Sequence, residues 1–177
     1  MKVVGFAGFS GAGKTTLVER LIPELCLQGL RVSVVKHAHH SFDIDHPGKD
    51  SYRHRQAGAY EVLIASDQRL ALMRELTQSR PLTVHEMLGE LDEGVDWVLV
   101  EGYKQSDLPK VEVWRSANGK PVRYPEDACV VAIATDSPSA LPHSTALPVL
   151  DLARPDDIVA WLLAHQDQFE YRCEALT

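Results

Sequence analysis

Residues 8–15 read Gly-Phe-Ser-Gly-Ala-Gly-Lys-Thr, a run that matches the pattern G-x-x-x-x-G-K-[ST] at every fixed position. A short apolar stretch, residues 2–7, precedes this run, and a segment with apolar residues at helical spacing follows it. Glycines allow backbone N–H groups to turn toward phosphate oxygens, and a helix that begins at such a loop directs the positive end of its dipole to the same anion. The context therefore predicts a phosphate-binding loop between a buried strand and a helix.

The residue types of this loop predict the contacts of a nucleoside triphosphate. We expect the phosphates to bind seven consecutive residues: Ser10, Gly11, Ala12, Gly13, Lys14, Thr15 and Thr16. The Lys14 ammonium can reach the β- and γ-phosphates. The Thr15 hydroxyl can ligate Mg²⁺, which usually keeps several of its waters.

The rest of the chain predicts an α/β fold built on a mostly parallel sheet. Strand, helix and strand follow one another within residues 2–36, and a βαβ unit of this kind pairs its two strands in parallel. Apolar runs indicate further buried strands at residues 96–100, 128–134 and 149–150. Pro155 marks the first turn of a final helix.

Two segments depart from this pattern. Residues 110–115 alternate between polar and apolar, which is typical of an edge strand that could pair with another chain. Residues 62–65 and 70–73 flank a short polar turn and predict an antiparallel hairpin inserted into the parallel arrangement. Since the chain shows neither a repeat nor a linker, we expect residues 1–177 to form a single domain with the three-layer P-loop NTPase fold.

A long polar loop and two short helices are predicted in the middle of the chain. The stretch 37–50 has no hydrophobic periodicity, and loops of this length are uncommon and usually functional. A short helix is expected from about Asp50 to Gly58. Thr83 and Glu86 form a capping box ahead of another helix.

Acidic residues follow two of the predicted buried strands. A phosphate-loop site needs a carboxylate at the end of another strand to hold the metal or its water shell. Glu101, followed by Gly102, ends the more continuous apolar run and is the preferred metal ligand beside Thr15. Asp136 could instead accept two hydrogen bonds from the N1–H and 2-amino group of guanine, or serve as a helix cap before Pro138.

The polar loop is rich in histidine and aspartate, at His37, His39, His40, His46, Asp43, Asp45 and Asp50. Imidazole and carboxylate suit zinc or nickel, but the spacing matches no closed zinc site and no cysteine joins it. We favour a polar loop beside the phosphates and keep transition-metal binding as the alternative. Lys36, Lys49, Asp45 and Asp50 are then candidates to face the γ-phosphate or a second substrate.

Composition excludes several classes of function. The net charge of −7 argues against non-specific binding to nucleic acid or to an anionic membrane. No apolar run approaches the roughly 20 residues that a membrane helix needs. The three cysteines are far apart and form no disulfide framework, so a cytoplasmic location is expected.

Four stretches occur along the chain in a characteristic order: AGFSGAGKTTL, VVKHAHHSFDIDHPGKDSYRHRQAGA, VLVEGYK and AIATD. Together they resemble the MobB family, the molybdopterin-guanine dinucleotide biosynthesis adaptor proteins. The likeness extends over nearly the whole chain. Its most specific part runs from Asp43 to Arg53, because many unrelated proteins carry the phosphate loop alone.

The resemblance implies a GTP-binding protein of the P-loop class that includes signal-recognition-particle-type GTPases. It implies weak GTP hydrolysis, a homodimer, and assistance to the guanylyltransferase that joins GMP to molybdopterin. It leaves open whether molybdopterin itself binds this chain. By position, residues 11–16 would bind phosphates and Mg²⁺, and Glu101 would take the second acidic role. Asp45, Lys49 and Asp50 would form a catalytic group near the hydrolysed or transferred phosphate.

The chain departs from the usual GTPase pattern at the residues that recognise the guanine base. Many GTPases recognise guanine with N-K-x-D, whereas only Thr135–Asp136 stands at the matching strand end here.

Two other functions fit the same phosphate loop. A small-molecule kinase usually has an arginine-bearing lid, but the predicted hairpin carries only Arg69 at its turn. A metallochaperone GTPase for nickel or a similar metal would use the histidine-rich loop. Formation of a phosphorylated metabolite would support the kinase, and tight metal binding lost on replacing His39 and His40 would support the metallochaperone.

Overall fold

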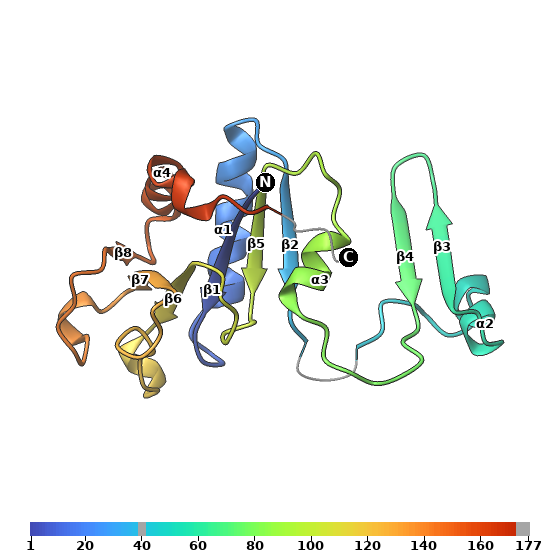
Figure 1. Ribbon diagram of the computed structural model, residues 1–177, viewed down its shortest axis with the longest axis horizontal. Coiled ribbons are helices and arrows are strands. Elements are labelled where there is room, and N and C mark those ends of the chain that lie inside the picture. The colour runs from blue at the N-terminus through green and yellow to red at the C-terminus, as the bar shows by residue number, and fades with distance from the viewer. Residues whose placement is uncertain (39–41, 173–177) are drawn as a thin grey trace. The chain divides into compact units, whose positions relative to one another are not determined.

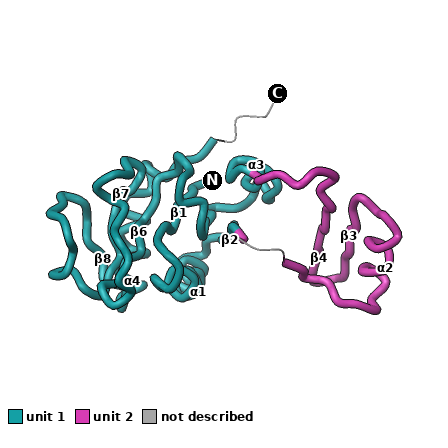
Figure 2. Tube along the Cα trace, turned by 90° about the horizontal axis from the view of Figure 1, so that it is seen from below, with its two compact units in different colours: residues 1–37, 83–177 teal, residues 38–82 magenta. Residues whose placement is uncertain are grey.

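The computed structural model describes residues 1–38 and 42–172. Within it the chain separates into two compact units, which Figure 2 colours differently. The first unit comprises residues 1–37 and 83–177, and the second comprises residues 38–82. The expectation of one domain over residues 1–177 stays a prediction.

A six-stranded, fully parallel sheet forms the first unit, in the order β2-β5-β1-β6-β7-β8 (Figure 1). The strands are β1 (Lys2–Ala7), β2 (Val32–Lys36), β5 (Trp97–Glu101), β6 (Lys110–Trp114), β7 (Val130–Thr135) and β8 (Val149–Asp151). The register pairs Glu101 of β5 with Phe6 of β1 on one side and with Lys36 of β2 on the other. The carboxyl ends of these three strands therefore lie level with one another, where ligands of open α/β sheets bind.

Helices cover both faces of this sheet, as the three-layer prediction requires. Helix α1 (Lys14–Leu27) and helix α4 (Pro155–Ala164) share one core cluster with alternate residues of the strands, such as Val4 and Leu99. Helix α3 (Val84–Gly89) packs with the opposite residues of the same strands, such as Val98. The capping box of Thr83 and Glu86 is present at the start of α3, as predicted. Three short 3₁₀ turns complete the unit: η1 (Ser116–Asn118), η2 (Pro138–Ala140) and η3 (Gln166–Phe169).

The prediction that residues 110–115 form an edge strand is wrong. Strand β6 lies between β1 and β7, and all five of its residues are buried. The alternation that suggested an exposed face comes from Lys110 and Glu112, whose charged side chains are buried with dedicated partners. The edges of the sheet are β2 and β8, so β6 offers no edge for pairing with another chain.

The second unit contains helix α2 (Asp50–Gln56) and the predicted antiparallel hairpin of β3 (Glu61–Ala65) and β4 (Leu70–Arg74). The hairpin forms a two-stranded sheet of its own, closed by a turn in which Ser66 N donates to Arg69 O at 2.8 Å. Arg55 of α2 connects the segment before the helix with the segment after the hairpin, because its guanidinium pairs with Asp43 at 2.9 Å and with Glu75 at 3.2 Å.

Candidate nucleotide-binding site

The loop between β1 and α1 has the backbone that a phosphate cradle requires. Gly8 adopts a φ of 145°, and a Cβ atom there would lie 2.3 Å from Val113 O of the neighbouring strand. Gly13 adopts a φ of 95° immediately before α1, in the left-handed region that residues with a side chain rarely occupy. These two positions explain why the sequence needs glycine at both ends of the loop.

Lys14, the first residue of α1, folds back over this loop. Its ammonium donates to Gly8 O at 2.9 Å and to Phe9 O at 3.0 Å. Desolvation by burial lowers the pKa of Lys14, while the charge of Glu101 opposes the shift and the charges of Lys104 and Lys36 add to it. The loop lysine therefore lies in a cluster of three cations and one carboxylate.

Thr15 and Glu101 lie in direct contact. The Thr15 hydroxyl donates to Glu101 Oε1 at 2.6 Å, and Lys36 Nζ lies 3.4 Å from Glu101 Oε2. The Glu101 side chain is only 12% exposed. The strand register produces this contact, since β5 is the neighbour of β1 and both strands end at the same level. The structure thus brings together the two predicted metal ligands, one hydroxyl and one carboxylate, which are the hard oxygen donors that Mg²⁺ prefers.

The residues after Glu101 make an unusual turn. Gly102 has a φ of 97°, and a Cβ atom there would lie 2.8 Å from His37 Cβ. Tyr103 has a φ of 45°, the one positive φ of a non-glycine residue among those that the structure describes. Its ring lies 4.7 Å from the ring of His37, between centroids. Gly102 thus allows the backbones at the ends of β5 and β2 to approach each other closely. Its contact with the nucleotide stays a prediction.

Asp136 directly follows β7 and is held by polar neighbours. Ser137 Oγ donates to Asp136 Oδ1 at 2.8 Å, and Arg115 Nε lies 3.6 Å from Asp136 Oδ2. The Asp136 side chain is 41% exposed, so the carboxylate remains accessible. Its role in reading guanine stays a prediction.

Two side chains beside the phosphate loop were missed by the sequence reading. The Arg115 guanidinium lies against Gly13, where a Cβ atom would be 3.3 Å from its Nε. Asn118 Nδ2 donates to Ser10 O at 3.1 Å. Both residues follow β6, which adjoins β1, and treating β6 as an edge strand hid their proximity to the loop.

The predicted catalytic group lies in the second unit. The Asp45 carboxylate accepts from Ser51 Oγ and from His46 N, each at 2.9 Å, and its Oδ2 is buried without a hydrogen-bond partner. Lys49 is the N-cap residue of α2, and Asp50 is the first residue of that helix. The approach of Asp45, Lys49 and Asp50 to a phosphate stays a prediction.

The histidine-rich loop gives no metal cluster in the part of the chain that can be described. No group of three or more His, Cys, Asp or Glu residues there is arranged to hold an ion. His39 and His40 lie outside the described residues.

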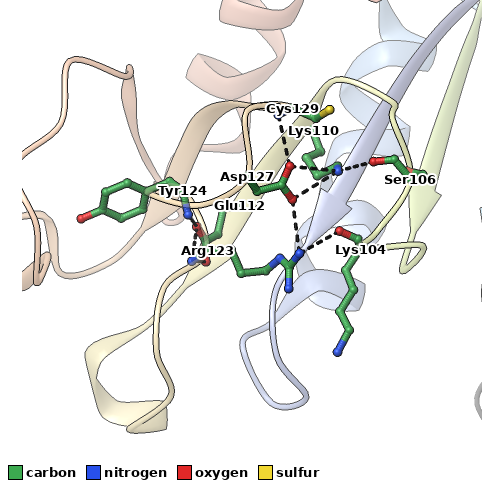
Figure 3. Close-up of polar contacts among 8 residues, drawn as sticks. All are labelled: Lys104, Ser106, Lys110, Glu112, Arg123, Tyr124, Asp127 and Cys129. Atoms are coloured by element: carbon green, nitrogen blue, oxygen red, sulfur yellow. Dashed lines mark hydrogen bonds and ion pairs between the residues drawn. The ribbon is translucent and has the colours of Figure 1, made fainter.

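A buried polar network supports the segment between β5 and β7 (Figure 3). Lys110 Nζ donates to Ser106 O at 2.6 Å and lies 3.3 Å from Asp127 Oδ2. The Glu112 carboxylate accepts from the backbone N–H groups of Arg123 and Tyr124, each at 2.8 Å. Burial raises the pKa of Glu112, and these backbone donors oppose the rise. The network was not predicted, because two charged residues in a strand ordinarily indicate an exposed face.

Comparisons with known proteins agree on one family. Residues 3–136 match the family model described as MobB, molybdopterin guanine dinucleotide synthesis protein B. The chain is 39% identical over 163 residues to the molybdopterin-guanine dinucleotide biosynthesis adapter protein of Escherichia coli K12, covering 90% of this chain and 93% of that one. The protein of the same name from Haemophilus influenzae is 41% identical over 166 residues, covering 90% and 89%.

Solved structures support the same assignment. A MobB protein homolog from Bacillus stearothermophilus superposes with a TM-score of 0.68 at 28% identity, covering 94% of this chain and 99% of that chain. Bacillus subtilis MobB gives a TM-score of 0.71 at 25% identity, covering 97% and 100%. Among the described residues, each helix is too short or too polar to cross a lipid bilayer. With the predicted P-loop fold confirmed and the match extending over most of its length, the chain belongs to the MobB family of molybdopterin guanine dinucleotide synthesis proteins.

Proposed function

We propose that this protein is a GTP-binding adaptor for the guanylyltransferase step of molybdopterin guanine dinucleotide synthesis. The relatives from Escherichia coli and Haemophilus influenzae are named adapter proteins of this biosynthesis. The observation that carries the proposal for this chain is the contact of Thr15 with Glu101 at 2.6 Å beside the Lys14 ammonium. Hydroxyl, carboxylate and ammonium are the three side-chain groups that bind a magnesium-bound triphosphate in proteins with this loop.

Mg²⁺ fits this pair of residues. Thr15 and Glu101 present oxygen atoms only, and Mg²⁺ is a cation that few protein oxygen ligands would hold together with the phosphates. When bound, Mg²⁺ neutralises charge on the phosphates. The side chains orient the nucleotide: Lys14 leaves the carbonyls of Gly8 and Phe9 for phosphate oxygens, and Lys36 keeps its contact with Glu101.

Hydrolysis by this protein is proposed to be slow. The Glu101 carboxylate is engaged by Thr15 and Lys36, so it is poorly suited to take a proton from an attacking water. Asp45, Lys49 and Asp50 are proposed to approach the terminal phosphate. A slow reaction suits an adaptor that carries GTP to a partner enzyme.

Guanine recognition is proposed for Asp136. Its carboxylate lies at the end of β7, where two oxygens can accept from the N1–H and 2-amino groups of guanine. The ion pair with Arg115 at 3.6 Å is long enough to leave this capacity available.

The test is a competition between GTP and ATP with Mg²⁺, with and without the partner guanylyltransferase. We expect GTP to bind at least about tenfold more tightly, and Asp136→Asn to reduce this preference. Ser137→Ala, which removes a neighbour of Asp136 but no carboxylate, is the matched control. A clear preference for ATP in the unaltered protein would overturn the adaptor proposal.

We propose further that two copies associate through the hairpin of the second unit and act in the cytoplasm. Four apolar side chains of the hairpin are exposed: Leu63, Ile64, Leu70 and Leu72. An isolated two-stranded hairpin is marginal in water, and a second copy can cover such a surface with the same surface. The guanylyltransferase, and molybdopterin if it binds this chain, are the other proposed partners; nucleic acid and membrane are not.

Light scattering after size-exclusion chromatography tests the association. We expect the unaltered protein to elute with twice the chain mass and the double variant L63S/L70S to elute with the mass of one chain. Leu27→Ser, which replaces a still more exposed leucine on α1, is the control and is expected to keep the double mass. A single-chain mass for the unaltered protein at all concentrations would refute the dimer.

A further inference from the structure

The segment between β5 and β6, residues 102–109, brings a second lysine to the phosphate loop. Lys104 Nζ lies 5.6 Å from the centroid of the Phe9 ring. Phe9 is the second residue of the phosphate loop, and its carbonyl accepts from Lys14 Nζ at 3.0 Å. The two ammonium groups therefore lie beside the same residue of the loop.

Lys104 differs from the two other lysines of this cluster because its ammonium forms neither a hydrogen bond nor an ion pair within the part of the chain that the structure describes. Lys14 donates to two loop carbonyls, and Lys36 pairs with Glu101. Among the residues that the structure describes, no carboxylate forms an ion pair with Lys104. Two ammonium groups beside the same loop residue repel each other, and an anion bound between them would be attracted to both.

The backbone around Lys104 is firmly anchored (Figure 3). Arg123 Nη2 donates to Lys104 O at 3.1 Å, and the buried Lys110 Nζ donates to Ser106 O at 2.6 Å. Asp127 joins the two donors, with its Oδ2 lying 3.3 Å from each of them. The Lys104 side chain extends away from this network. A fixed backbone with a free ammonium reduces the entropy lost when the side chain meets a ligand.

The residue before Lys104 adds a second constraint. Tyr103 is held at a φ of 45°, and Ser106 N donates to Tyr103 O at 2.8 Å to close the turn. Backbone strain of this kind persists where the surrounding structure imposes it, and it concentrates at functional sites.

We propose that Lys104 is a second phosphate-binding lysine, which contacts the terminal phosphate of the bound nucleoside triphosphate from within the same chain. The inference rests on the proposed function, because it assumes that a triphosphate occupies the loop. Glu101, which directly precedes the segment, would hold Mg²⁺ beside the outer phosphates, whereas Asp136 lies at the strand end proposed to bind the base. Lys104 therefore faces the γ-phosphate end of the nucleotide.

Calorimetric titrations with GTP and with GDP, both with Mg²⁺, test this role. We expect Lys104→Met to raise the Kd for GTP about tenfold and the Kd for GDP less than about threefold, because only GTP carries the contacted phosphate. Lys104→Arg is expected to restore most of the GTP affinity, since it keeps the charge. Lys2→Met removes the same charge at the opposite end of β1 and is expected to change neither Kd.

The outcomes separate the inference from the proposed function. Absence of GTP binding in the unaltered protein would refute the proposed function itself. Unaltered GTP binding in Lys104→Met, or equal losses for GTP and GDP, would overturn the role of Lys104 while leaving the proposed function intact. Circular dichroism of each variant checks the fold, which an exposed side chain at position 104 should not disturb.

Discussion

The two compact units place their charged and apolar side chains in opposite ways. In the first unit, the central strand β6 buries the charged Lys110 and Glu112, each with partners. In the second unit, the hairpin exposes leucines such as Leu63 and Leu70. Burying a charge is tolerated only with complete partners, whereas an exposed apolar face is stabilised by being covered. The buried charges of the first unit thus have partners within that unit, whereas the hairpin of the second unit leaves apolar side chains uncovered.

The largest expected effect in this comparison comes from breaking the buried network. Lys110→Met should destabilise the first unit by about 3 kcal/mol, because removing one partner of a buried ion pair leaves the other charge buried. Urea denaturation followed by tryptophan fluorescence measures this loss. Every tryptophan lies in the first unit, so the signal reports on that unit alone.

Lys120→Met is the control for this prediction. Lys120 is exposed, and its replacement should change the free energy of unfolding by less than about 0.5 kcal/mol. Equal stability of the two variants would show that the buried network does not support the first unit.

Much of the first unit could be predicted from local patterns. The apolar runs that became β1, β5 and β7, the capping box at Thr83 and the position of Glu101 at a strand end all follow from short stretches of sequence. The order of strands could not be predicted in this way, since it depends on which runs pair in space. The position of β6 and the proximity of Arg115 and Asn118 to the loop were therefore missed.

The second unit was predicted as a hairpin, but its supporting contacts were not. In the structure the Arg55 guanidinium binds Asp43 and Glu75, which lie outside its own helix. Contacts of this kind depend on tertiary structure and leave no local signal.

A smaller effect is expected at the strand-end site of the first unit. Glu101→Gln should weaken GTP binding about tenfold when Mg²⁺ is present and change it little when Mg²⁺ is chelated, because the lost charge faces the cation. Titrations under both conditions measure the difference. Glu170→Gln, at the far end of β1, is the charge-matched control. Equal losses with and without Mg²⁺ would argue that Glu101 acts on the fold rather than on the metal.

The smallest effect concerns the second unit and depends on pH. Hydrogen bonds from Arg55 lower the pKa of Asp43 from 3.8 to about 2. Since the folded pKa lies below the unfolded one, the stabilisation is present above the ordinary pKa and is lost as the pH falls toward the folded value. Asp43→Asn should therefore weaken the hairpin near neutral pH and cease to differ from the unaltered protein near pH 2.

NMR amide signals of β3 and β4 during urea titrations at several pH values measure this prediction. A difference between Asp43→Asn and the unaltered protein that is independent of pH would contradict the role of the Arg55–Asp43 pair.

The most direct test of the account is a GTP titration of Lys14→Ala beside the unaltered protein, with Mg²⁺ present. The ammonium that now caps the carbonyls of Gly8 and Phe9 is the loop's own positive side chain for the phosphates. We predict that the variant stays folded and loses affinity at least about a hundredfold. Unchanged affinity in a folded Lys14→Ala protein would contradict the assignment of the nucleotide site.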